Sequence, residues 1–335
     1  MRTSTGLVFL AVAAVACSKR AEKIAADQPA PSVAPAPIPK TPRVIASGQD
    51  HPWGVFVDDR FVWWTNKGQG SGVVARRAKS GGAIEQMATA KAPFAIATFG
   101  PHVFWSDARA LGGGIGHRLE SLPIGVDAEC GIKIVEPWSI AVAGGRLFWT
   151  DLKERVVASA PLLTSPPPAG PAAPFDCHAH LVHARTAGRP VGLAVDASHV
   201  FWTDSDPGVV ASAPIAGGAV SELYKGGDKT TGIAVDATHV YWSEWGSGRI
   251  AKVPKSGGAA VVLASDQKGA RAIALDSSHV YFTHPPTGSI RSVAKSGGAV
   301  RVHGTGQKHP YSVAVDASSI YWANVDGDTV MAVDK

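Results

Sequence analysis

The chain has 335 residues, of which 45% are hydrophobic and 18% are charged, and it contains 37 glycines and 24 prolines. This length allows one large core or two small ones, and the composition favours short strands and tight turns over long helices. The net charge is +5, but the basic residues are scattered, with no run of five or more, which argues against a nucleic-acid-binding protein.

Residues 1–17 are predicted to be a signal peptide. Arg2 is followed by an apolar stretch that is too short to span a bilayer and ends in small residues. Cys17 comes directly after this stretch, and the junction resembles a bacterial lipobox, although Ala14 occupies the position where Leu is usual. The resemblance implies a lipid on Cys17 and, because Ser18 follows it, attachment to the outer membrane. An ordinary signal peptide with an incidental cysteine is the alternative.

Residues 18–42 are rich in Ala, Pro and Lys. Proline at this density removes backbone donors and disfavours helix and sheet, so this segment is predicted to be a disordered, solvated tether. The rest of the chain, residues 43–335, is predicted to be the folded domain.

The folded domain consists of repeats, each marked by a pair of aromatic residues. The second aromatic residue advances by 41, 44, 53, 40, 40 and 40 positions. A period of about 40–45 residues with strand-like content is typical of propeller blades. The pairs are Trp63-Trp64, Phe104-Trp105, Phe148-Trp149, Phe201-Trp202, Tyr241-Trp242, Tyr281-Phe282 and Tyr321-Trp322.

One repeat shows the expected anatomy of a blade. Its four strands are predicted at Gly232–Val235, His239–Ser243, Arg249–Pro254 and Ala260–Ala264. The last repeat stops after its third strand, whereas the segment at 43–47 matches a fourth strand. We therefore expect an all-β, seven-bladed β-propeller closed by pairing of the N-terminal strand with the last blade. An insertion at 164–178 lengthens the third blade.

The second strands read WWTN, FWSD, FWTD, FWTD, YWSE, YFTH and YWAN, and these resemble the YWTD repeats of low-density-lipoprotein-receptor propellers. The preceding strands, such as GLAVDASHVFW, resemble NHL repeats and streptogramin lyases, and the whole pattern is similar to propeller lipoproteins of bacteria. The resemblance covers residues 43–335, with one repeat more than the receptor type. It implies the fold and little about function, because propellers host both binding and catalysis.

Repeated polar residues at one end of the blades are predicted to be structural. Turn aspartates are expected to accept hydrogen bonds from nearby backbone N–H groups, and histidines on separate blades would lie too far apart to share a metal. The residues are Asp58, Asp196, Asp236, Asp276 and Asp316, with His102, His199, His239 and His279.

At the opposite end, the residue that enters each first strand is predicted to face the mouth of the central channel. These residues are Trp53, Phe94, Trp138, Val191, Thr231, Arg271 and Tyr311, so half of the mouth would be aromatic. The second strands end in Asn66, Asp107, Asp151, Asp204, Glu244, His284 and Asn324, which would add acids beside Arg271.

Exposed aromatic rings near polar groups stack on sugars, peptides or ring ligands. The predicted ligand-binding residues are Trp53, Phe94, Trp138, Arg271, Tyr311, Asp151, Asp204, Glu244, Trp245 and His284. The alternative is that the rings pack against the neighbouring blade and the acids cap loops.

Two cysteines besides Cys17 precede the fourth strands of adjacent blades. Cys130 and Cys177 are predicted to form a disulfide in an oxidising compartment, with two separate thiols as the alternative. The histidines at 178, 180 and 183 follow Cys177, but no second ligand pair lies nearby in the sequence, so no metal site is predicted.

No Gly-x-Ser-x-Gly elbow, phosphate loop or HExxH motif is present. The leading hypothesis is a lipid-anchored, non-catalytic binding module that holds a peptide, glycan or partner protein at the channel mouth without a cofactor. The alternative is a metal-assisted lyase or lactonase with a divalent cation near Asp151, Asp204 or Glu244. Streptogramin lyases use a histidine and an acid with magnesium, and Glu244 with His284 matches that pair only loosely. A purely structural scaffold is the third reading.

Overall fold

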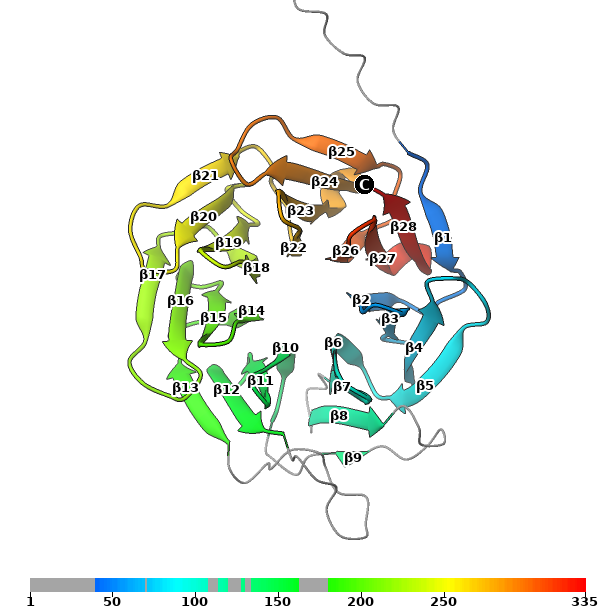
Figure 1. The fold of residues 1–335 in the computed structure, drawn as a ribbon, viewed down its shortest axis with the longest axis horizontal. Coiled ribbons are helices and arrows are strands. Elements are labelled where there is room, and N and C mark those ends of the chain that lie inside the picture. Colours follow the sequence, from blue (N-terminus) through cyan, green and yellow to red (C-terminus); the bar gives the residue numbers. More distant parts are fainter. Residues whose placement is uncertain (1–39, 70, 108–113, 120–127, 130–133, 163–179) are drawn as a thin grey trace, which may run out of the picture. The chain divides into compact units, whose positions relative to one another are not determined.

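The computed structural model describes residues 40–335 except 70, 108–113, 120–127, 130–133 and 163–179. The predicted signal peptide with Cys17, the predicted tether up to residue 39, Cys130, Cys177 and the whole insertion at 164–178 lie outside the described residues. In the described part, seven antiparallel sheets of four strands form a ring, which confirms the predicted seven-bladed propeller (Figure 1).

Each of the first six blades is formed by four consecutive strands. Blade 1 contains β2 (Pro52–Val57), β3 (Phe61–Asn66), β4 (Gly72–Ala78) and β5 (Glu85–Ala90). Blade 2 contains β6 (Pro93–Phe99), β7 (His102–Asp107), β8 (Gly114–Leu119) and β9 (Ala128–Glu129). Blade 3 contains β10 (Pro137–Ala143), β11 (Arg146–Asp151), β12 (Val156–Pro161) and β13 (Leu181–Arg185).

The second half of the ring repeats this pattern. Blade 4 contains β14 (Pro190–Val195), β15 (His199–Asp204), β16 (Val209–Pro214) and β17 (Ser221–Lys225). Blade 5 contains β18 (Thr230–Val235), β19 (His239–Glu244), β20 (Ile250–Pro254) and β21 (Val261–Ala264). Blade 6 contains β22 (Ile273–Leu275), β23 (His279–His284), the 3-10 turn η2 (Pro285–Thr287), β24 (Ser289–Ala294) and β25 (Arg301–Gly304).

Blade 7 closes the ring with strands from both ends of the domain. It contains β26 (Pro310–Val315), β27 (Ser319–Asn324), the 3-10 turn η3 (Val325–Gly327), β28 (Thr329–Asp334) and, on the outside, β1 (Arg43–Ala46). Arg43 lies opposite Ala332 in the antiparallel pairing of β1 with β28, and its guanidinium forms an ion pair with Asp334. Because β1 supplies the fourth strand of the last sheet, that blade has the same four-stranded order as the others.

The aromatic pairs form the cores between the blades. Side chains of successive residues in a strand point to opposite faces. The two rings of a pair therefore enter different interfaces: Trp63 packs towards Trp105 of blade 2, and Trp64 packs towards Tyr321 of blade 7. The other interfaces repeat this arrangement, with the first aromatic residue of one blade meeting the second of the next. The repeated pair thus explains both the period of the sequence and the stacking of the sheets.

Candidate functional site

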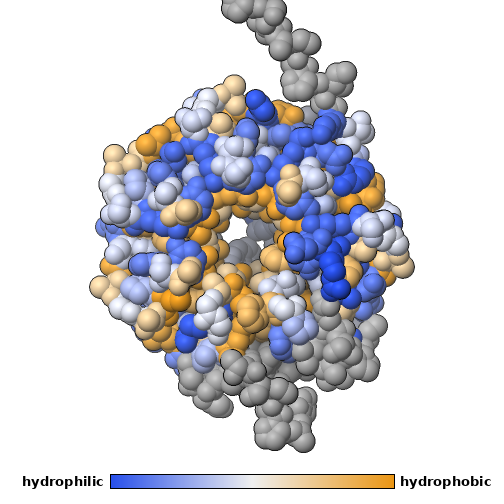
Figure 2. All heavy atoms as spheres, viewed as in Figure 1, coloured by the Kyte–Doolittle hydropathy of each residue, from blue (hydrophilic) through white to orange (hydrophobic). Residues whose placement is uncertain are grey.

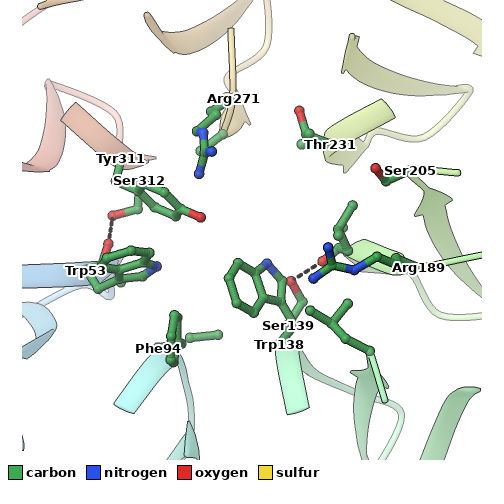
Figure 3. A pocket seen from close by; sticks show the side chains of 17 residues that line it. Trp53, Phe94, Trp138, Ser139, Arg189, Ser205, Thr231, Arg271, Tyr311 and Ser312 are labelled. Carbon is green, nitrogen blue, oxygen red and sulfur yellow. Dashed lines mark hydrogen bonds between the residues drawn. The ribbon is translucent and has the colours of Figure 1, made fainter. Parts of the chain in front are cut away.

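A cavity of about 400 Å³ lies within the central channel. Figure 2 shows the opening at the centre of the ring, with hydrophobic residues along much of its wall. All seven predicted entry residues line this cavity, six as the second residue of a first strand and Arg271 from two residues before β22: Trp53, Phe94, Trp138, Val191, Thr231, Arg271 and Tyr311 (Figure 3). The alignment of repeats thus located the residues that face the channel.

A circle of side-chain hydroxyl groups fixes the backbone of these entry residues. Each carbonyl oxygen of an entry residue accepts a hydrogen bond from a Ser or Thr of the preceding blade. The pairs, donor first, are Thr65–Phe94, Ser106–Trp138, Ser139–Val191, Thr203–Thr231, Ser243–Arg271, Thr283–Tyr311 and Ser312–Trp53. A hydrogen bond at each blade boundary restricts the backbone that carries the side chain into the channel.

The blades approach one another closely at this level. The residue after each entry residue is small: Gly54, Ala95, Ser139, Gly192, Gly232, Ala272 and Ser312. A Cβ atom at Gly54 would lie 2.1 Å from the carbonyl oxygen of Phe94, which leaves no space for a larger residue. Within the first strands, the bulky side chains at the mouth therefore stand at the entry positions and not at the positions that follow them.

Four aromatic rings form a continuous arc across blades 7, 1, 2 and 3. The ring centroids are 4.2 Å apart for Tyr311 and Trp53, 5.1 Å for Trp53 and Phe94, and 4.8 Å for Phe94 and Trp138. Phe94 is buried, whereas the other three rings are half-buried and border the cavity. The rings thus pack across blade boundaries and also present apolar surface to the channel.

Cationic side chains lie at this arc. The Arg271 guanidinium carbon is 4.5 Å from the ring centroid of Tyr311, and Lys67 Nζ is 5.1 Å from the rings of both Trp53 and Phe94. Burial raises the pKa of Tyr311, and Arg271 only partly opposes this effect, so the phenol is neutral at physiological pH.

The predicted acids and His284 do not line the cavity. Each is the last residue of its second strand, and each is at most 5% exposed: Asp151, Asp204, Glu244 and His284. The structure therefore does not place these four residues beside the aromatic arc. The acidic half of the mouth expected from the sequence is absent among the described residues that line it.

These buried groups bind the loops that lead into the first strands or the loops beside them. Asp151 accepts hydrogen bonds from the backbone N–H groups of Val135 and Lys153, and Asp204 accepts one from Gly188. Burial raises the pKa of Asp204, while its backbone donors act in the opposite direction. The acids thus position the loops next to the entry residues, as the loop-capping alternative described.

Glu244 and His284 have similar local partners. Glu244 accepts hydrogen bonds from the Ser247 hydroxyl and from Trp242 Nε1, and His284 Nδ1 lies 2.7 Å from Thr287 Oγ1. Burial, with the charge of Arg291, lowers the pKa of His284 and favours the neutral imidazole.

Trp245 lies outside the cavity wall. The residue is 38% exposed, and Lys229 Nζ is 4.9 Å from its ring centroid. It is therefore an exposed tryptophan near the same end of the propeller that does not belong to the arc.

Sequence reasoning missed Arg189, which lines the cavity together with Ser205 and Leu152. Figure 3 shows Arg189 and Arg271 directed into the cavity from different blades. Arg189 directly precedes strand β14 and lies two positions before the entry residue Val191, in a loop that the repeat pattern does not include.

The repeated aspartates at the other end are structural, as predicted. Asp236 accepts hydrogen bonds from the backbone N–H groups of Thr238 and His239 and forms an ion pair with Lys295 of the next blade, with an N–O distance of 2.8 Å. Three further boundaries carry the same pair: Asp196–Lys255, Asp276–Lys335 and Asp316–Lys79.

The metal-cluster motif does not form a site in the described residues. His183 is buried with its Nε2 2.8 Å from Ser159 Oγ, whereas His180 is exposed. Across the described ranges no three His, Cys, Asp or Glu side chains are grouped to bind a metal ion. The same ranges contain no helix of the length and hydrophobicity needed to cross a membrane.

Comparison with known proteins identifies the fold and leaves the family open. No family model and no curated protein matches the chain. Among solved structures, the chain is similar to virginiamycin B lyase from Staphylococcus aureus, with a TM-score of 0.71 and 13% identity over 88% of this chain and 99% of that one. It is also similar to a streptogramin B lyase, with a TM-score of 0.70 and 11% identity over 87% and 96% of the two chains.

A third similar structure comes from a nidogen/laminin complex. Its TM-score is 0.52 and its identity 21%, over 70% of this chain and 88% of that one. Identities this low establish a shared propeller fold alone. The expected likeness to streptogramin lyases is thus confirmed for the fold, and membership of a YWTD-type or lipoprotein family stays a prediction.

Proposed function

We propose that this propeller is a binding module that holds a ligand in the channel at the aromatic arc. The observation that carries the proposal is the arc itself, because Trp53, Trp138 and Tyr311 leave large apolar rings beside a cavity. Blades 4 and 5 carry the smaller Val191 and Thr231 at the same positions, so the fold does not require large rings there. Large, incompletely buried aromatic surfaces beside polar groups are typical of ligand sites.

The predicted anchor fits such a role. A lipid on Cys17 followed by the tether at 18–42 would attach the module to the bacterial outer membrane, where it could capture a peptide, a glycan or a partner protein. This part of the proposal rests on the sequence alone.

A metal-assisted lyase or lactonase at the same mouth is the competing function, and the fold likeness to virginiamycin B lyase is its motivation. The chemistry would need a carboxylate or imidazole facing the ligand. Among the described residues the candidates Asp151, Asp204 and Glu244 are buried beneath loops, and none lines the cavity. The geometry therefore favours binding.

The first prediction concerns the arc. Replacing Trp53→Ala together with Trp138→Ala should weaken binding of a ligand by about tenfold or more, because stacked aromatic residues dominate such sites. Calorimetry with a panel of aromatic carboxylates, aromatic peptides and oligosaccharides measures the effect, and circular dichroism checks that the variant is folded.

Trp245→Ala is the matched control, since it removes an exposed tryptophan outside the cavity. Binding that survives in the double variant, or a folded wild-type protein that binds no member of the panel, would contradict the proposed function.

A further inference from the structure

The charge of the cavity wall narrows the class of ligand. Arg189 and Arg271 line the cavity, and no Asp or Glu is found among the described residues that do so. Lys67 adds a third cationic group at the arc, 5.1 Å from two of its rings. A cavity lined by charges of one sign concentrates ligands of the opposite sign.

These arginines are not neutralised by neighbouring acids. The ion pairs found within the described ranges include neither Arg189 nor Arg271. Asp204 and Glu244, which end the second strands of blades 4 and 5, are buried and accept hydrogen bonds from Gly188 N–H and the Ser247 hydroxyl instead. The two guanidinium groups therefore present unneutralised positive charge to a ligand, with Arg271 held against the Tyr311 ring.

The remaining polar side chains of the described wall are hydroxyl groups, which keep acceptor lone pairs but have few donors left for a ligand. The Ser139 and Ser312 hydroxyls already donate to backbone carbonyls, and Thr231 Oγ1 lies 3.0 Å from Ser243 Oγ. No side-chain amide or carboxylate belongs to the described part of the wall. The guanidinium groups of Arg189 and Arg271 are therefore the main side-chain donors of this wall, which suits an anionic ligand rich in acceptors better than a neutral glycan.

We propose that the mouth binds a planar aromatic anion, such as an aromatic carboxylate. The ring lies against Trp53 and Trp138, and the carboxylate accepts hydrogen bonds from Arg271 and Arg189, which point into the same cavity (Figure 3). The volume of about 400 Å³ is sufficient for a fused two-ring ligand. This inference rests on the proposed function and specifies its ligand class.

The test compares 2-naphthoate with 2-naphthamide, which has the same ring system without the charge. Calorimetry should show tighter binding of the carboxylate by about tenfold or more, and the difference should shrink as salt is raised from 0.05 to about 0.5 M, because salt screens the partly exposed arginines. Cyclohexanecarboxylate and glucuronate, which keep the charge but lack an aromatic ring, should bind more weakly than naphthoate.

Arg271→Gln and Arg189→Gln should each reduce naphthoate affinity by about five- to 50-fold while leaving naphthamide binding nearly unchanged. Arg185→Gln is the matched control, because it removes the same charge from the exposed outer strand β13. Thermal unfolding shows whether the arginine variants keep their fold.

The outcomes separate this inference from the proposed function. Equal binding of carboxylate and amide, with both lost in the Trp53→Ala, Trp138→Ala double variant, would overturn the anionic class and leave the arc as a binding site. Preferred binding of glucuronate would point to an acidic glycan and also overturn the aromatic class. Naphthoate binding that is insensitive to both the tryptophans and the arginines would overturn both proposals.

Discussion

At the scale of single residues, the hydroxyl group that follows each aromatic pair has a specific role. It occupies the position of Thr65, Ser106, Thr150, Thr203, Ser243 and Thr283, and five of these six groups donate to the entry carbonyl of the next blade. In blade 7 the position is Ala323, and Ser312 on the neighbouring strand makes the link to Trp53 instead. The circle of hydrogen bonds is complete because Ser312 on β26 supplies the donor that Ala323 on β27 lacks.

Ser312→Ala should therefore destabilise the protein by about 1 kcal/mol, because it leaves the Trp53 carbonyl without its donor. Adding Ala323→Ser should recover part of this loss by restoring the donor used in other blades. Chemical denaturation measures both, with Ser80→Ala in an exposed turn as the control. A Ser312→Ala variant as stable as the wild type would show that the link contributes nothing.

Residue identity alone did not reveal what the second-strand acids do. Asp151 and Asp204 carry the chemistry of a cation or sugar site, and their position at the channel end of a strand suggested exposure. The loops that cover them have no repeated pattern, so the sequence does not show which backbone N–H groups need an acceptor there. Arg189, which does reach the cavity, is part of such a loop.

At the scale of strands and blades, the boundaries combine aromatic cores with ion pairs. Partial burial would raise the pKa of Asp236, but the Lys295 ammonium of the next blade and backbone donors outweigh it and lower the pKa well below the usual value for aspartate. Asp196, Asp276 and Asp316 show the same balance. Blade boundaries therefore contain a contribution to stability that depends on pH.

The lowered pKa of Asp236 fixes the direction in which stability changes with pH. The folded protein holds the proton on Asp236 less tightly than the unfolded chain, so this stabilisation is present above the unfolded-state pKa of about 4 and is lost as the pH falls below it. Asp236→Asn should cost about 1–2 kcal/mol at pH 7, and its difference from the wild type should shrink between pH 5 and pH 2.

Denaturation curves over this pH range provide the measurement, with Asp59→Asn in an exposed turn as the control for an isolated charge. A deficit that stays constant down to pH 2 would mean that the ion pair is not its source.

The strands were the most predictable elements. The period of the aromatic pairs predicted seven blades correctly. Each blade needs one ring for each of its two interfaces, so the pair recurs once in every blade. The boundaries differed by one or two residues: β18 begins at Thr230 rather than Gly232, and β19 includes Glu244, which had been expected in a loop. The exact strand ends depend on hydrogen bonds with neighbouring loops, which the pattern of hydrophobic residues in the sequence does not predict.

At the scale of the whole molecule, closure of the ring brings the seven equivalent entry positions to one opening. These positions carry different side chains. The pairing of β1 with β28 joins blade 7 to blade 1, and this places Tyr311 4.2 Å from Trp53 although 258 positions separate them in the chain. The contact that adds Tyr311 to the aromatic arc thus exists only in the closed ring. The mouth departs from strict repetition, with rings on one side and two arginines towards the other, and the proposed ligand site rests on this asymmetry.

A crystal structure of the protein with 2-naphthoate tests the central claim most directly. The account predicts the ligand inside the channel, with its rings against Trp53 and Trp138 and its carboxylate within hydrogen-bond distance of Arg271. A channel that stays free of ligand at concentrations that saturate binding in solution, or a ligand bound elsewhere on the surface, would contradict it.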